Sequence, residues 1–137
     1  MKRHKKVLIL CTGNSCRSII AEALINAKLD RCVQAYSSGV KASGKVNPHA
    51  KELLQEHDMW REEYHSKTID TVIDEDFDLV VTVCDHAKET CPVFTKPVKT
   101  IHIGFEDPDG KGPEAFVQTL LEIETRLLPV VEKELCQ

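Results

Sequence analysis

Short, continuous apolar runs alternate with amphipathic stretches along this chain. The runs at residues 7–10 (VLIL) and 79–83 (LVVTV) are rich in β-branched residues, as is typical of parallel strands buried on both faces. Two further stretches, residues 33–37 and 98–101, alternate in polarity and are expected to form the outer strands. The pattern therefore predicts four strands.

Helical periodicity separates these runs. Apolar residues within 19–27 fall on one helical face, which predicts an amphipathic helix. Asn47 followed by Pro48 is typical of an N-cap with proline at the first helical position. A last helix is expected to begin at Pro113, and Pro129 should kink or end it.

Strands that alternate with helices predict right-handed β-α-β units and an α/β fold, with a parallel sheet covered on both faces. The 137 residues are enough for one domain, which we expect to span residues 1–137. Ligands of such folds bind beyond the carboxyl ends of the strands. Cys11 and Cys84 each follow a predicted strand there, which is the first indication of a site.

Composition narrows the possible partners. The formal net charge is −4, which argues against nucleic acid or an anionic membrane as a partner. The apolar stretch near the N-terminus is too short for a signal peptide, so a cytoplasmic location is expected. The chain has six cysteines, but their spacings do not match structural zinc sites. We expect no metal and no cofactor.

The stretch CTGNSCRS, from Cys11 to Ser18, joins the first strand to the first helix. A loop of small residues ahead of a helix gathers backbone N–H groups around one point, and the helix N-terminus attracts an anion. Arg17 adds a fork that suits a tetrahedral oxyanion. These positive surroundings should lower the pKa of Cys11. The alternative is that both cysteines merely pack and Arg17 is a surface residue.

The octet resembles the phosphate-binding loop of low-molecular-weight protein tyrosine phosphatases, and is still more similar to the thioredoxin-coupled arsenate reductases built on that fold. The similarity extends over nearly the whole chain. It is carried by CTGNSCRS, YSSG (36–39), VNPHA (46–50), VVTVCDHAKETCP (80–92) and GFEDP (104–108). The resemblance implies a three-layer fold with a four-stranded parallel sheet of order 2-1-3-4 and helices on both faces.

The resemblance also implies the roles of residues. Cys11 would be the nucleophile, Arg17 would hold the oxyanion, Ser18 would hydrogen-bond the thiolate, and Asp107 would be the general acid. Cys16 would be a loop residue and not a redox partner. The expected oxyanion-binding residues are Thr12, Gly13, Asn14, Ser15, Cys16, Arg17 and Ser18.

Cys84 and Cys91 distinguish a reductase from a phosphatase, which needs neither. The implied relay passes from Cys11 to Cys84 and then to Cys91, with the last disulfide reduced by thioredoxin. If residues 86–91 form a helix, the Cα atoms of Cys84 and Cys91 lie roughly 10 Å apart. A disulfide needs about 4.4–6.8 Å, so this segment must unwind. The alternative is that both cysteines are ordinary buried residues.

The sequence thus predicts an arsenate reductase that acts in arsenic detoxification. Its expected partners are arsenate, with phosphate or sulfate as competitors, and thioredoxin; we expect a monomer. Alternatives are a low-molecular-weight tyrosine phosphatase, or a non-catalytic oxyanion-binding redox sensor. Cys32 and Cys136 match nothing in the family pattern and are expected to be bystanders, with Cys136 exposed. Some family members place a monovalent cation near the positions of Asn14, Glu22 and Ser37; Lys67 should exclude it here.

Overall fold

The computed structural model describes residues 4–84 and 98–136. Four parallel strands form one sheet of order β2-β1-β3-β4, which confirms the predicted order. The elements run in the order β1 (Lys5–Cys11), α1 (Arg17–Lys28), β2 (Val33–Gly39), α2 (Pro48–Glu56), the 3₁₀ helix η1 (Ile69–Thr71), β3 (Leu79–Thr82), β4 (Lys99–His102), α4 (Pro113–Arg126) and α5 (Leu128–Leu135).

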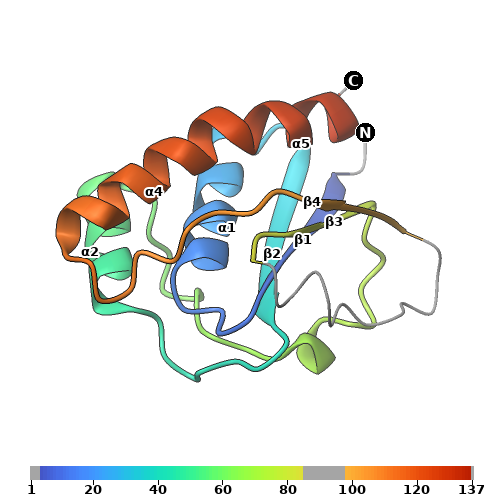
Figure 1. Ribbon diagram of the computed structural model, residues 1–137. Coiled ribbons are helices and arrows are strands. Elements are labelled where there is room, and N and C mark those ends of the chain that lie inside the picture. The colour runs from blue at the N-terminus through green and yellow to red at the C-terminus, as the bar shows by residue number, and fades with distance from the viewer. Residues whose placement is uncertain (1–3, 85–97, 137) are drawn as a thin grey trace.

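The four apolar residues 7–10 of β1 are completely buried, because β1 is a central strand with both faces covered. Helices α1, α2, α4 and α5 pack together on one face, and α4 and α5 form the long rod above α1 in Figure 1. On the other face Leu8 and Val80 pack with Val72, in the segment that contains η1. The main hydrophobic core lies under the helices.

The helix starts follow from local sequence signals. The Asn47 side chain accepts a hydrogen bond from the His49 N–H, and Pro48 is the first residue of α2, as predicted. Pro113 begins α4. Helix α4 ends at Arg126, and Pro129 lies in the first turn of α5, so the predicted break at this proline is confirmed. Among the described residues, no helix is both long and apolar enough to cross a lipid bilayer.

Cys32 and Cys136 form a disulfide, a pairing that the sequence did not predict. Their Cα atoms lie 5.5 Å apart although 104 positions separate them in the sequence. Cys32 directly precedes β2 and Cys136 directly follows α5. The disulfide therefore lies at the end of the sheet where the strands begin, and Cys11 lies at the end where β1 finishes. Both cysteines are partly buried, and Cys136 is therefore not the exposed residue that was expected.

Candidate active site

The two cysteines expected at one sheet edge lie together. Strands β1 and β3 are hydrogen-bonded neighbours, with Leu10 opposite Thr82. Cys11 ends β1, and Cys84 follows β3 by two residues. The side chains of Cys11 and Cys84 are close enough that Cys84 raises the pKa of Cys11, and both are buried. The Thr12 hydroxyl lies 3.0 Å from the Cys84 sulfur, so the loop itself contacts the second thiol.

The loop between β1 and α1 turns its carbonyl oxygens outward. The carbonyls of Cys11, Thr12, Gly13 and Ser15 accept hydrogen bonds of 2.8–3.0 Å from the N–H groups of Val40, Lys41, Ser43 and Asn47, respectively. In the part of the chain that the structure describes, the N–H groups of residues 13–15 donate to no protein atom. A set of unused N–H donors ahead of a helix is suited to an oxyanion.

Asn14 holds the loop in this shape. Its backbone has φ 50°, in the left-handed region that asparagine tolerates better than most residues. Its buried side chain donates to the hydroxyl oxygens of Ser18 at 2.8 Å and Ser37 at 2.9 Å. Its amide oxygen accepts from the Lys67 N–H at 2.9 Å. The side chain thus ties the loop to α1, to β2 and to the segment that precedes η1.

Arg17 lies at the start of α1 with its guanidinium directed toward the loop after β4. Its Nη1 donates to the Phe105 carbonyl at 3.1 Å, and its Nη2 lies 3.6 Å from Asp107 Oδ2. Its Nε is buried and has no hydrogen-bond partner among the described residues. A buried donor without an acceptor is unfavourable, and a bound oxyanion would supply the acceptor.

Asp107 is brought to the loop, where an acid acting on a bound oxyanion must lie. Its carboxylate accepts a hydrogen bond from the Cys16 thiol at 3.5 Å and another from the Asp109 N–H at 3.0 Å. Burial, together with the charge of Asp107, raises the pKa of Cys16 to about 11. Cys16 is therefore a thiol at neutral pH, which agrees with its expected role as a loop residue.

The expected depression of the Cys11 pKa is not found in this arrangement. The hydrogen bond with Cys84 and then burial raise the pKa of Cys11, and they outweigh Arg17, which lowers it. Two thiols that share a hydrogen bond titrate as a pair, so the sequence argument failed because it considered Cys11 alone. A free Cys11 thiolate requires that the Cys84 contact be replaced.

A cleft of about 410 Å³ opens beside these groups and is lined by Arg17, Cys84, Gly104, Phe105 and Glu106. Phe105 is its one aromatic lining residue within the described ranges, and that side chain is buried beneath Arg126, whose guanidinium lies 4.8 Å from the ring centre. Cys91, the third cysteine of the expected relay, lies outside the described residues.

Sequence reasoning missed three residues that support the site. The Ser66 hydroxyl donates to the Gly13 carbonyl at 2.9 Å, and Arg126 donates to the Gly104 carbonyl at 3.2 Å. Gly39 stood in a quoted motif, but no role was given to it. None of these residues has a local pattern that reveals its partner, because each contact joins segments far apart in the chain.

The geometry agrees with comparisons to known proteins. The model of the family "Low molecular weight phosphotyrosine protein phosphatase" matches residues 6–135. The chain belongs to the low molecular weight phosphotyrosine protein phosphatase family. Within this family it is 39% identical over 132 residues to arsenate reductase 1 of Bacillus cereus, covering 96% of this chain and 98% of that protein.

Solved structures agree with the family assignment. The arsenate reductase of Archaeoglobus fulgidus is 35% identical, with a TM-score of 0.77 and coverage of 91% of this chain and 98% of that chain. The low molecular weight protein tyrosine phosphatase of T. tengcongensis is 28% identical, with a TM-score of 0.81 and coverage of 94% and 99%, respectively. The family therefore includes both activities on one fold, while the sequence relatives at about 40% identity are arsenate reductases. These relatives support arsenate reductase function.

Replacing Gly39 with alanine is expected to weaken oxyanion binding at least tenfold. An added Cβ would lie 2.5 Å from the Thr12 carbonyl oxygen and 3.1 Å from the Asn14 nitrogen, and these backbone atoms can move only if the loop deforms. The affinity for sulfate, measured by calorimetry, tests this. Gly112→Ala is the control: its φ of 88° makes alanine strained, yet a Cβ there meets nothing within 4 Å. It should lower stability by about 1–3 kcal/mol and leave sulfate affinity unchanged.

Proposed function

We propose that the protein reduces arsenate to arsenite, with Cys11 as the nucleophile and Cys84 as the thiol that completes the first disulfide. The observation that carries the proposal is the contact between the Cys11 and Cys84 side chains beside the oxyanion loop. A phosphoryl-transfer mechanism has no use for a second thiol at this point. A reduction that yields a disulfide requires one.

The electrons and atoms balance with these two cysteines. In the first step Cys11 displaces one oxygen of arsenate as water, which leaves a covalent sulfur–arsenic bond. In the second step Cys84 attacks the Cys11 sulfur and the sulfur–arsenic bond breaks. Its electron pair stays on arsenic, which is thereby reduced from As(V) to As(III). The two thiols lose two electrons and two protons as the disulfide forms.

Arg17 and Asp107 assist the first step in this proposal. The loop amides and Arg17 hold the oxyanion, and Asp107, whose side chain is half exposed, donates a proton to the departing oxygen. Binding of arsenate would also compete with Asp107 for Arg17, since the ion pair of 3.6 Å is long and easily exchanged. The contacts of Arg17 and Asp107 therefore allow one to bind the oxyanion and the other to donate a proton.

Regeneration of the thiols completes the proposal. Cys91 would attack Cys84, release Cys11 as a thiol and carry the disulfide to thioredoxin. The sequence supports this step, and Cys91 lies outside the described residues. Cys32 and Cys136 are already joined, and Cys16 is a buried thiol that donates to Asp107, so we assign the resolving role to Cys91.

A reconstituted assay tests the proposed function. Arsenate, thioredoxin, thioredoxin reductase and NADPH are mixed with the protein, and NADPH oxidation and arsenite are both measured. We expect one arsenite per NADPH over many cycles, and none with Cys11→Ser. Hydrolysis of p-nitrophenyl phosphate is followed in parallel. Rapid phosphate release without arsenite would favour a phosphatase, and arsenate binding without turnover would favour a redox sensor.

A further inference from the structure

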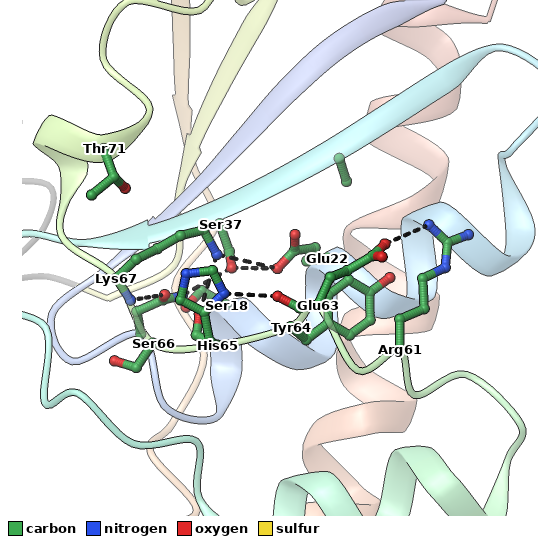
Figure 2. Close-up of polar contacts among 12 residues, drawn as sticks. Ser18, Glu22, Ser37, Arg61, Glu63, Tyr64, His65, Ser66, Lys67 and Thr71 are labelled. Atoms are coloured by element: carbon green, nitrogen blue, oxygen red, sulfur yellow. Dashed lines mark hydrogen bonds and ion pairs between the residues drawn. The ribbon is translucent and has the colours of Figure 1, made fainter.

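A chain of buried polar groups runs beneath the oxyanion loop. Glu22 on α1, Ser37 on β2 and Asn14 in the loop are 6%, 0% and 0% exposed, respectively. The Ser37 hydroxyl donates to Glu22 Oε1 at 2.5 Å, and Asn14 donates to the oxygens of both Ser37 and Ser18. Figure 2 shows Glu22 and Ser37 facing each other, with Lys67 alongside. This chain links a carboxyl group on the helix to the loop.

Donor and acceptor roles along this row of buried polar groups can be assigned in only one way. Both N–H donors of the Asn14 amide are given to hydroxyl oxygens, so the single hydrogen of Ser37 must go to Glu22. This arrangement requires that Glu22 Oε1 carry no hydrogen, a condition that the ionised carboxylate always meets. The Ser18 hydroxyl likewise accepts from Asn14, so its own hydrogen is not used in this contact. Protonation of Glu22 on the oxygen that faces Ser37 would place two hydrogens in one contact and disrupt the chain.

Lys67 supplies the positive charge beside this carboxylate. The two side chains are 11% and 8% exposed, and Lys67 Nζ lies 4.0 Å from Glu22 Oε1. Lys67 Nζ also donates to the His65 carbonyl at 3.2 Å. The backbone of Lys67 is fixed at both ends, since its N–H donates to Asn14 and its carbonyl accepts from the Gly39 N–H. The ammonium is therefore held in place beside Glu22.

The other charged groups near Glu22 either lower its pKa less than Lys67 does or raise it. Burial raises the pKa of Glu22; Lys67 is the first of the groups that lower it, followed by Ser37 and His65, while Glu63 raises it. Glu63 lies on the exposed side and pairs with Arg61 at 3.7 Å. Burial raises the pKa of Tyr64, and the charge of Glu22 adds to this shift. Among these groups Lys67 is therefore the one that opposes the effect of burial most strongly.

We propose that Lys67 is a positioning residue whose ammonium is the built-in counter-ion of Glu22, and that this pair sets the hydrogen-bond direction of the oxyanion loop. The role rests on the proposed function, because it matters only if the loop binds an oxyanion. Lys67 touches neither the substrate nor the reacting sulfurs. It acts through Glu22, Ser37 and Asn14.

The experiment measures sulfate affinity by calorimetry between pH 6 and 9, because sulfate keeps its charge throughout this range. Lys67→Met raises the pKa of Glu22, so this carboxyl is protonated at low pH and ionised at high pH. We expect about tenfold weaker binding than wild type at pH 6.5, with the ratio approaching one by pH 9. Lys67→Arg keeps the charge and should stay within threefold of wild type at every pH.

Glu22→Gln combined with Lys67→Met removes both charges while the glutamine oxygen still accepts from Ser37. We expect this double variant to recover most of the affinity that Lys67→Met loses, without the pH dependence, and it carries the test if Lys67→Met does not fold. A pH-independent loss in Lys67→Met, or a double variant that binds tenfold more weakly than wild type, would overturn the proposal. Sulfate binding requires no turnover, so failure of the reductase assay would not produce either result.

Discussion

Cys84→Ser is expected to stop repeated arsenate turnover, reducing it by at least about 10³-fold, while sulfate affinity stays within threefold of wild type. The serine hydroxyl is not a nucleophile toward the Cys11 sulfur, so no disulfide forms and the arsenic adduct is not released as arsenite. The hydroxyl replaces the thiol beside Thr12 with little change in volume. The measurements are NADPH oxidation over many cycles and calorimetric binding of sulfate.

The matched control removes two other cysteines. Cys32→Ser with Cys136→Ser lies at the opposite end of the sheet from Cys11 and should keep wild-type turnover at 25 °C. If Cys84→Ser still cycled at the wild-type rate, the proposed first disulfide would be wrong. Loss of sulfate binding in Cys84→Ser would instead show that this thiol is needed for oxyanion binding, which contradicts the expected separation of binding from the relay.

Reduction of the Cys32–Cys136 disulfide is expected to lower the free energy of unfolding by about 4 kcal/mol. The bond closes a loop of 104 positions, and loss of such a constraint frees the unfolded chain more than a short loop would. For a chain of this size the melting temperature should fall by on the order of 10 °C. Thermal unfolding with and without dithiothreitol measures this effect.

The double serine variant provides the control for stability. It should melt at the temperature of the reduced wild type and should not respond to dithiothreitol. If wild type and variant melted together without reductant, the disulfide would contribute nothing measurable to stability. A reductant effect that persisted in the double variant would assign the stabilisation to other cysteines.

The fold was predictable because its signals are local. The VLIL and LVVTV runs identify the two central strands, Asn47–Pro48 and Pro113 identify two helix starts, and the alternation of strands with helices implies a parallel sheet. The order of the strands came from the family resemblance. Strand β2 continues to Gly39, two residues beyond the predicted end, because Gly39 pairs with Cys11 across the sheet. Such extensions depend on the partner strand and not on local sequence.

The candidate site was predictable only in part. The meeting of Cys11 and Cys84 follows from topology, since parallel neighbouring strands place their carboxyl ends together. The raised pKa of Cys11 and the Cys32–Cys136 bond did not follow, because each depends on a partner that is distant in sequence. The same reason hid Arg126, which meets the loop after β4 from the far end of α4.

The outward carbonyls of the loop have a practical consequence for protein engineering. The curvature of CTGNSCRS depends on Asn14 within the octet, but also on donors in residues 40–47 and on Ser66, which lie outside it. A peptide with this sequence alone, or the octet grafted between a strand and a helix of an unrelated scaffold, should therefore capture no anion. The transferable unit is the octet together with the two outer segments that bend it.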